Sequence, residues 1–386
     1  MRNLIQKINF RFGRPSCQVL VLKSRHSGVI ESSLTDLRRF TSDISNSTLF
    51  LSPRFFWKLF WLLRCNDKDV AYFLALIQYI RPAVVISTDA LVTMKRTSML
   101  HELSEQVKNI SFISVPHGSY EKGYEFHPLD QSTGKELQIE SEVILASIGR
   151  RDIESYNRWG LRHRRVCPIG LLSNGIYLRD RMVPVNEKRI QICIVEHLGD
   201  PSKNHLLLQS KALKAFETLC EYVDEYAQAT SIDIKIAVRP ISKLIFDSDN
   251  EIGWVLDWFK NKFKSEISFT DSSVDFSTHL ASDESALTVG VDSTALLESI
   301  DRGNKVLTMW YDDSPLGIPQ NDWMFLKNPS LEHFKDVVAD ILETDIQVYL
   351  EKTKLDREIL IECKDGSDAV KNLRNLIDEC IESRRE

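Results

Sequence analysis

The residues that bear most directly on chemistry follow an apolar run at positions 285–291. A small polar pair, Ser293 and Thr294, comes next, and residues 295–300 then have the pattern of a helix that Gly303 is placed to end. The first-turn amides of a helix have no partner inside it and carry partial positive charge, so an anion is stabilised there. Because Ser293 and Thr294 add hydroxyl donors, this turn predicts a phosphate-binding site.

Glu298 extends this prediction from a phosphate to a nucleotide. It lies four residues after Thr294, on the same face of the helix and about one turn deeper, where its carboxylate could accept hydrogen bonds from a ribose diol. The alternative is an ordinary helix cap, because Asp, Ser and Thr are the usual capping residues and Glu often follows them. This stretch alone leaves both interpretations open.

Length and composition are typical of a two-domain globular protein. The 386 residues are many for a single core, and the chain has 43% hydrophobic and 27% charged residues. A formal charge of −6 lacks the excess of positive charge that is typical of nucleic-acid-binding proteins. Seven scattered cysteines without a CxxC pair argue against a zinc site and for reduced thiols. No apolar run is long enough to span a membrane. We therefore expect a cytoplasmic protein.

Strand-like and helix-like patterns alternate in two successive series along the chain. This predicts an α/β protein with two Rossmann-like, doubly wound domains facing a cleft. We expect residues 1–175 to form the first domain, 188–330 the second, and 331–386 the closing helices. A helix is expected at 33–40 and an irregular linker at 171–187. The expected strands are 18–22, 83–87, 110–115, 142–146 and 165–170 in the first domain, and 189–195, 233–238, 266–269, 285–291 and 305–309 in the second.

Two candidate catalytic residues follow strands of the first domain. Asp89 comes after strand 83–87, and His117 comes after strand 110–115, next to Gly118. Ligands of open parallel sheets collect at the carboxyl ends of the strands, and an imidazole with an ordinary pKa of about 6.5 suits proton transfer at neutral pH. His117 is the preferred general base and Asp89 its competitor. His117 could instead bind phosphate or shape its loop, and Asp89 could cap a turn.

Arg239 is a candidate for binding the donor phosphate, because it directly follows strand 233–238 of the second domain. The alternative is a pair with a surface carboxylate. Asp-x-Asp triplets occur at 67–69 and 247–249, but both are typical of polar loops leading into helices. We therefore expect no metal site and no cofactor, and chemistry that does not depend on a metal ion.

Several short motifs occur in one order over most of the chain: Pro116-His117-Gly118, a strand that ends at Gly170, Arg239-Pro240, and the stretch 293–298 with Gly303. In these motifs the sequence resembles glycosyltransferases of the GT-B fold. Among those it is most similar to bacterial surface-polysaccharide enzymes, which include polysialyltransferase-like, capsular Kdo-transferase-like and glycerophosphotransferase-like proteins.

The resemblance implies a donor nucleotide held by the second domain, an acceptor held by the first, and chemistry in the cleft. By the match of motifs, Ser293 and Thr294 bind the donor phosphate and Glu298 lies near the ribose. Many relatives have His-Pro where this chain has Arg239-Pro240. Arginine keeps a cation for phosphate but cannot act as an acid at neutral pH, so its expected role is electrostatic.

The predicted activity is that of a glycosyltransferase that moves a sugar from a CMP-, UDP- or GDP-linked donor to a growing cell-surface polysaccharide, such as capsule or O-antigen, or to a lipid-linked glycan. The alternatives are a CDP-glycerol-type polyol-phosphate transferase, a sugar epimerase of the same shape, and a non-catalytic polysaccharide-assembly protein that retains the fold. The expected partners are the nucleotide-sugar donor and the glycan or lipid-linked acceptor, with no nucleic acid.

One aromatic segment adds the inner face of the cell membrane as a candidate partner. Residues 54–64 are densely aromatic and apolar and carry cations at both ends. Such a segment can lie in a membrane interface with its rings in the headgroup zone. A buried helix is the preferred interpretation, and peripheral membrane association is the alternative.

Overall fold

The computed structural model describes most of the chain and divides it into two compact units. One unit contains the residues up to Ile176 together with the segment from Glu362, and the other contains Tyr177–Ile361. The described residues are 9–11, 14–23, 27–43, 48–50, 52–66, 68–87, 99–116, 139–149, 161–180, 190–196, 198, 207–238, 250–271, 273–291, 293–310, 321–361 and 368–384.

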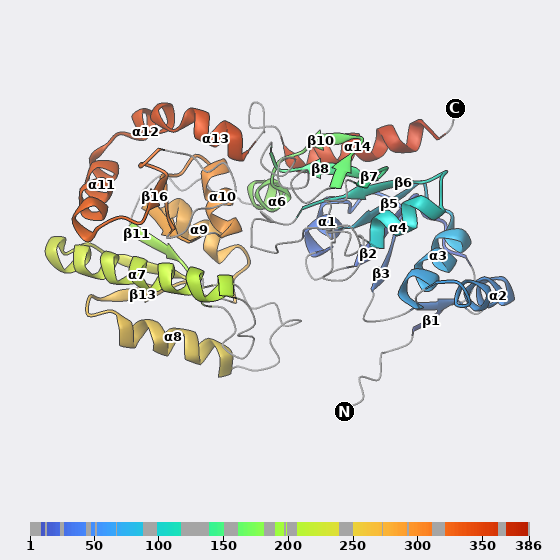
Figure 1. The fold of residues 1–386 in the computed structure, drawn as a ribbon, viewed down its shortest axis with the longest axis horizontal. Coiled ribbons are helices and arrows are strands. Elements are labelled where there is room, and N and C mark those ends of the chain that lie inside the picture. The colour runs from blue at the N-terminus through green and yellow to red at the C-terminus, as the bar shows by residue number, and fades with distance from the viewer. Residues whose placement is uncertain are drawn as a thin grey trace, which may run out of the picture. The chain divides into compact units, whose positions relative to one another are not determined.

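The first unit is built on a six-stranded parallel sheet with the order β10-β8-β6-β5-β2-β3 (Figure 1). Two short parallel pairs, β1 (Asn9–Arg11) with β4 (Thr48–Phe50) and β7 (Ile139–Ser141) with β9 (Leu161–His163), accompany it. The five strands that the sequence predicted for this unit are present. The strands of the sheet are β2 (Val19–Lys23), β3 (Arg39–Asp43), β5 (Val84–Ser87), β6 (Ser111–Ser114), β8 (Ile144–Ser147) and β10 (Val166–Pro168).

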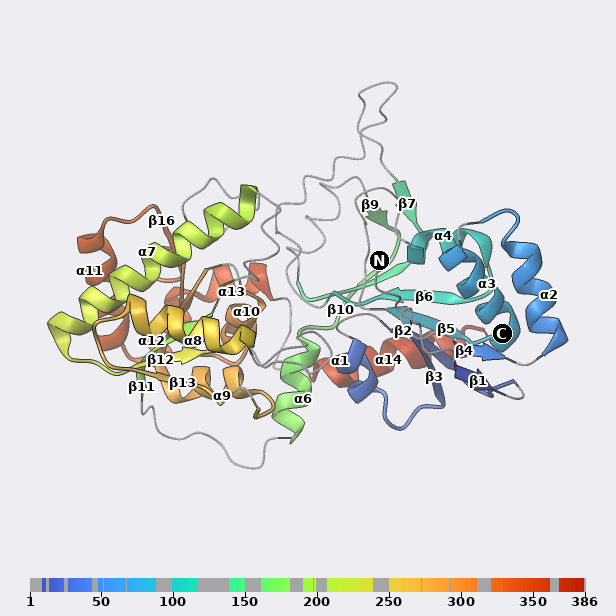
Figure 2. The same ribbon diagram turned by 90° about the horizontal axis from the view of Figure 1, so that it is seen from below.

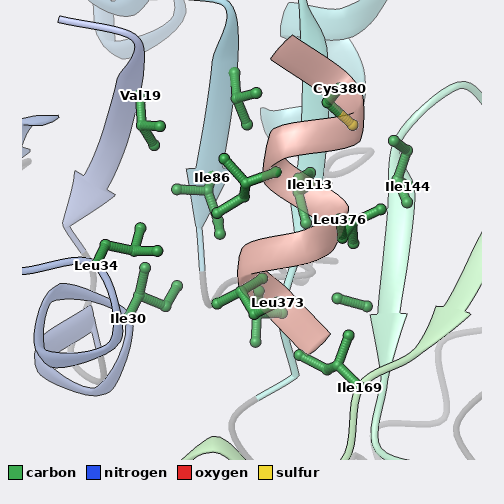
Figure 3. Close-up of a cluster of buried hydrophobic side chains, with 14 of the residues drawn as sticks. Val19, Ile30, Leu34, Ile86, Ile113, Ile144, Ile169, Leu373, Leu376 and Cys380 are labelled. Carbon is green, nitrogen blue, oxygen red and sulfur yellow. The ribbon is translucent and has the colours of Figure 1, made fainter. Parts of the chain in front are cut away.

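Helices cover both faces of this sheet. On one face, α14 (Ala369–Glu382) packs with α1 (Ser27–Ser33), and Leu373 and Leu376 meet Ile86 and Ile113 of the strands (Figure 3). The buried residues of α14 recur every three or four positions, as one apolar face of a helix requires. The other face carries α2 (Pro53–Leu62), α3 (Lys68–Ile80) and α4 (Met99–Gln106). The C-terminal helix therefore belongs to the core of the N-terminal unit.

The second unit contains another six-stranded parallel sheet, with the order β13-β12-β11-β14-β15-β16. Helices α9 and α10 pack on each other and on β14, while α7 and α11 pack on each other and on β15 and β14 respectively. The strands are β11 (Ile190–Val195), β12 (Ile234–Ala237), β13 (Ile267–Phe269), β14 (Ser285–Gly290), β15 (Val306–Trp310) and β16 (Phe325–Lys327). The helices are α7 (Leu207–Thr230), α8 (Asn250–Lys262), α9 (Ser277–Glu284), α10 (Thr294–Asp301), α11 (Leu331–Glu343), α12 (Ile346–Lys352) and α13 (Lys354–Leu360) (Figure 2).

Two local predictions are wrong. The helix expected at 33–40 ends at Ser33, and Arg39–Asp43 is strand β3, which pairs with β2 from Val19 onward. The hydrogen bonds of an edge strand outweighed the weak helical pattern there. Residues 172–180 form α6 (Leu172–Asp180) instead of an irregular linker, because Leu172, Ile176 and Tyr177 are buried on one side of it. The change from the first unit to the second falls inside this helix.

Candidate functional site

Helix α10 begins at the point where the strand order of the second sheet reverses. Numbered along the chain, the strands of this sheet run 3-2-1-4-5-6, and the reversal lies between β11 and β14. In open α/β sheets, ligands bind in the crevice beyond the carboxyl ends of the strands at this point. Because α10 follows β14, its N-terminus lies near the carboxyl end of that strand, beside the reversal. Phosphate binding by Ser293 and Thr294 stays a prediction.

Ser293 has the backbone of a helix N-cap, with φ −118° and ψ 138°, but its hydroxyl makes no capping hydrogen bond to the amides of α10. Ser330, at the start of α11, does cap, and accepts a hydrogen bond from the His333 amide at 3.2 Å. The ordinary-cap interpretation of Ser293 therefore lacks the contact that would define it. The Ser293 hydroxyl and the first-turn amides of α10 remain suited to a bound anion.

Two glycines set the position of α10. A Cβ on Gly290, the last residue of β14, would lie 3.1 Å from both Cδ atoms of Leu296, so a side chain there would press on Leu296 of the helix. Gly303 has φ +82°, a left-handed conformation that favours glycine, and ends the helix as predicted. Gly290 therefore lies where β14 contacts α10, and Gly303 lies where α10 ends.

A buried guanidinium connects α10 to α9. Arg302 donates from Nε to Asp283 Oδ1 at 2.8 Å, from Nη1 to the Glu298 carbonyl at 3.0 Å, and from Nη2 to the His279 carbonyl at 3.3 Å. Its side chain is almost fully buried. A cation at these carbonyls also complements the negative end of a helix dipole. Arg302 therefore holds the two helices in one fixed geometry.

Asp283 is the counterion, and it is fully engaged. Its Oδ2 accepts a hydrogen bond from the Tyr177 hydroxyl at 3.0 Å, and its Oδ1 accepts one from Asn304 Nδ2 at 2.8 Å. Burial by itself would raise the pKa of Asp283, but the charge of Arg302 and these hydrogen bonds hold that pKa below its usual value. The Asp283–Arg302 pair is therefore a charged pair inside the protein.

Glu298 lies next to His279. The His279 Nε2 atom is 3.5 Å from Glu298 Oε2, and both side chains are largely buried. Burial, with the nearby charge of Arg302, lowers the pKa of His279 to about 3, so the imidazole is neutral and the contact is not an ion pair. The rings of Phe276 and Tyr177 lie about 5 Å from the imidazole, at 5.1 and 5.0 Å between centroids. The Glu298 carboxylate therefore lies beside His279, which packs among the rings of Phe276 and Tyr177, about one turn along α10 from Thr294.

Buried hydroxyls join the same elements. Ser282 of α9 is hydrogen-bonded to Thr288 of β14, at 2.8 Å between the hydroxyl oxygens, and to Ser299 of α10. Each hydroxyl can act as donor and acceptor, so a chain of three can satisfy itself inside the core. Together with the Arg302 contacts, this chain fixes α10 against both its strand and its neighbouring helix.

Three neighbouring strands of the first sheet end at serines, whereas strand β14 of the second sheet is followed by helix α10. Ser87, Ser114 and Ser147 lie at the carboxyl ends of β5, β6 and β8, three neighbouring strands, and Ser87 is directly opposite Ser114. All three are buried. Within the described part of the chain, the hydroxyls of Ser114 and Ser147 have no hydrogen-bond partner.

Three predicted site residues, Asp89, His117 and Arg239, lie outside the described residues. Asp89 follows the end of β5 by two residues and His117 follows the end of β6 by three, and these strands are neighbours. Arg239 follows Val238, just beyond β12. Their roles stay predictions.

The sequence argument missed Glu196, a buried carboxylate directly after β11. Because Ile194 pairs with Val289, Glu196 is level with Val291, at the start of the turn that leads to Ser293. The signal was available, since an acidic residue directly after an apolar strand is the pattern used for Asp89. Tyr177, His279, Asp283, Arg302 and Asn304 were also missed, because only the folded chain brings them together.

Within the described ranges, no three His, Cys, Asp or Glu side chains lie together as a metal-binding group. Residues 67 and 247–249, from the Asp-x-Asp triplets, fall outside those ranges. Metal-independent chemistry stays a prediction.

The sequence matches no protein-family model and no curated protein. Solved structures do match. A glycosyltransferase from Rickettsia africae ESF-5 is 11% identical over 95% of this chain and 99% of its own, with a TM-score of 0.51. A putative UDP-N-acetylglucosamine 2-epimerase from Listeria monocytogenes is 10% identical over 94% and 96%, also at 0.51. A trehalose-6-phosphate protein from E. coli bound with UDP-2-fluoro glucose is 9% identical over 94% and 98%, again at 0.51.

These likenesses cover nearly the whole chain and both of its sheets. The chain therefore has the GT-B fold, with two Rossmann-like units, as the sequence predicted. At about 10% identity they are evidence for the fold alone.

Proposed function

We propose that this protein is a glycosyltransferase that binds a nucleotide-sugar donor at the N-terminus of α10 and transfers the sugar to a cell-surface polysaccharide or lipid-linked glycan. The observation that carries the proposal is the α10 turn itself. It lies at the strand-order reversal of a 3-2-1-4-5-6 sheet, its N-cap Ser293 makes no capping bond, and buried contacts hold the helix in place. A rigid set of donors facing a crevice is what an anionic ligand requires.

The donor contacts follow from position along α10. The first-turn amides and the hydroxyls of Ser293 and Thr294 bind a donor phosphate, and the Glu298 carboxylate, one turn deeper, accepts hydrogen bonds from the ribose. As the sugar leaves, negative charge grows on the phosphate, and donors fixed in advance stabilise it without reorganising. Arg239 adds a permanent positive charge in this scheme.

The acceptor belongs to the first unit in this proposal. His117 removes the proton from the attacking hydroxyl, with Asp89 as the competing base. Both residues follow neighbouring strands of one sheet edge, β6 and β5. The acceptor class, a capsule- or O-antigen-type glycan, rests on the resemblance of the sequence motifs.

The test is ligand binding to the purified protein, measured by thermal shift and calorimetry with CMP, CDP, UDP, UMP, GDP and dTDP. A ligand that binds only the folded state adds about 2.7 kcal/mol at a hundredfold excess over its dissociation constant. We expect one nucleotide to stabilise the protein, and Ser293→Ala or Glu298→Gln to weaken its binding at least tenfold, about 1.4 kcal/mol. Its base names the donor class.

Ser330→Ala is the matched control. It removes a serine from another helix N-terminus, where the hydroxyl does cap, so it lowers stability by about 1 kcal/mol and leaves nucleotide binding unchanged. Ser293→Ala is expected to weaken nucleotide binding and to leave stability unchanged, because its hydroxyl makes no capping hydrogen bond. A well-folded protein that binds none of the nucleotides contradicts the proposal and favours the assembly-protein alternative.

Product analysis separates the enzymatic alternatives. A glycosyltransferase releases the nucleotide only when an acceptor is elongated by a sugar. Conversion of a UDP-sugar without any acceptor identifies an epimerase instead. Elongation by glycerol phosphate from CDP-glycerol identifies the polyol-phosphate transferase.

A further inference from the structure

Helix α2 presents a row of aromatic rings to solvent. Trp57, Phe60 and Trp61 are 70%, 56% and 57% exposed, and Phe56 and Leu63 are also exposed. Only the opposite side of the helix is buried, where Phe55 packs against Phe50 and Tyr79. The preferred sequence interpretation, a buried helix, is therefore wrong for the outer face of α2.

Helix α2 lies on the outside of the first unit, next to α3, in both views (Figures 1 and 2). Residues 56, 57, 60 and 61 recur at the spacing that places side chains on one side of a helix. Water-exposed rings grouped in this way are uncommon on a monomeric protein and mark an interaction surface.

The same segment is positively charged, although the protein as a whole has a formal charge of −6. Residues 53–66 contain Arg54, Lys58 and Arg64 and no acidic residue. The Arg64 guanidinium lies 4.7 Å from the centroid of the Phe60 ring and 5.5 Å from that of Trp61, so cation and aromatic surface form one patch.

We propose that α2 binds the surface of an anionic lipid bilayer, with its outer rings in the headgroup zone and its cations on lipid phosphates. Trp is well suited to this position because an apolar ring carries one polar N–H. A short amphipathic helix with aromatic residues on one face and basic residues around them lies in the plane of a membrane interface. Among the described residues no helix has the length and apolar character to cross a bilayer, so the attachment is peripheral.

A lipid surface fits this face better than a second copy of the chain. In a symmetric pair, α2 would meet α2, and Arg54 and Arg64 of one copy would face Arg54 and Arg64 of the other, since Lys58 donates to Gln78 of α3. Like charges brought together in this way oppose association. An anionic bilayer instead offers negative charge opposite each cation and apolar acyl chains below the rings.

The experiment is co-sedimentation of the full chain with vesicles of equal parts phosphatidylglycerol and phosphatidylcholine, and with phosphatidylcholine alone. We expect binding to the mixed vesicles and at least tenfold weaker binding to the neutral ones. Trp57→Ser with Trp61→Ser lowers the affinity at least about tenfold. Arg54→Gln with Arg64→Gln lowers it about twenty-fivefold, from about fivefold per cation, and removes much of the salt dependence.

The matched control is Trp254→Ser with Leu355→Ser, which removes two exposed apolar side chains of the second unit, 41% and 74% exposed. It leaves vesicle binding unchanged. Because all the replaced side chains are exposed, thermal unfolding should be the same in every variant. Vesicles with brominated acyl chains should quench Trp fluorescence in the wild-type protein and not in the Trp57/Trp61 variant.

Three results overturn the proposal. One is a wild-type protein that binds no anionic vesicles, and another is an α2 variant that binds as well as the wild type. The third is a dimer, seen by light scattering, that requires Trp57 and Trp61 in the absence of vesicle binding. Each can occur whether or not a nucleotide binds at α10, so this test is independent of the proposed activity.

Discussion

The two six-stranded sheets differ in the point at which their strand order reverses. Numbered along the chain, the first runs 2-1-3-4-5-6, with its reversal between β2 and β5, and the second runs 3-2-1-4-5-6, with its reversal between β11 and β14. Both orders are doubly wound, and both place a ligand crevice at the reversal. The second order is the one associated with dinucleotide binding. Strand order alone thus distinguishes the two units.

The carboxyl ends of the sheets differ in chemistry as well. Neighbouring strands of the first sheet end at neutral serines, two of them without a hydrogen-bond partner among the described residues. The second sheet ends at Glu196 and at a helix held by the Arg302–Asp283 pair. Two strands of the first sheet therefore end at hydroxyls that lack described hydrogen-bond partners, whereas strand β14 of the second leads into a helix held by a buried, charged network. Substitutions in the Arg302–Asp283 network and at the serines of the first sheet test this difference, because the network should contribute more to stability than the serines.

Removing Arg302 should have the largest effect. Arg302→Leu leaves Asp283 buried without its counterion, and we expect a loss of about 3–5 kcal/mol in the free energy of unfolding of the second unit. Urea denaturation measures it. Arg164→Leu is the control, because Arg164 pairs with Glu140 and Glu142 at the exposed surface, where the loss of an ion pair should cost far less. Equal losses would mean that the network does not hold α10.

Enlarging Gly290 tests the strand–helix contact directly. In Gly290→Ala the new methyl meets the Leu296 side chain at 3.1 Å, so that buried side chain must move by a few tenths of an ångström, with an expected loss of about 1–3 kcal/mol and weaker nucleotide binding. Gly253→Ala, in α8, is the control, because nothing lies within 4 Å of its Cβ. That substitution should stabilise the protein by about 0.5–1 kcal/mol, as alanine does inside a helix. If both variants gain stability, the close approach at Gly290 is not a constraint.

Acidification should weaken the second unit through His279. The folded protein holds the pKa of His279 at about 3, whereas an ordinary imidazole has 6.5, so below pH 6.5 the unfolded chain takes up a proton that the folded chain refuses. Stability therefore falls as the pH drops, by about 2 kcal/mol at pH 5. The charged groups facing the imidazole are Glu298, Asp283 and Arg302.

The measurement is urea denaturation at pH 7 and pH 5. His279→Gln should reduce the difference between the two pH values by about 2 kcal/mol. Burial also lowers the pKa of His101 and His163 in the first unit, so part of the pH dependence should persist in the variant. An unchanged difference in His279→Gln would show that the imidazole is protonated in the folded state.

The serines of the first sheet should give the smallest effect. Ser114→Ala and Ser147→Ala each delete a buried hydroxyl without a described partner, so the free energy of unfolding should change by less than about 0.5 kcal/mol or rise. Ser282→Ala in the second unit removes a partner of both Thr288 and Ser299 and should cost about 1–3 kcal/mol. Chemical denaturation compares the three variants. A large loss at Ser114 would reveal a contact of that hydroxyl beyond the described residues.

The sequence was sufficient for the GT-B fold class and for the α10 turn. Short apolar runs such as 190–195 and 285–291 are buried on both faces of a parallel sheet whatever their neighbours are, so their pattern identifies them. Gly303 was recognisable because a left-handed helix end favours glycine. The helical pattern at 33–40 misled because pairing with β2 decided that segment.

What the tertiary structure decided concerns residues far apart in the chain. Tyr177 and Asp283 are 106 positions apart, and no local pattern marks them as partners. The sequence placed α14 among the closing helices, but only packing selected the first sheet as the surface that buries its apolar face. For α2 the composition favoured a buried helix, whereas the structure exposes its outer rings. The physical reason is common to all three: periodicity determines which side of an element is apolar, whereas the partner of that side depends on which surfaces remain free once the whole chain has folded.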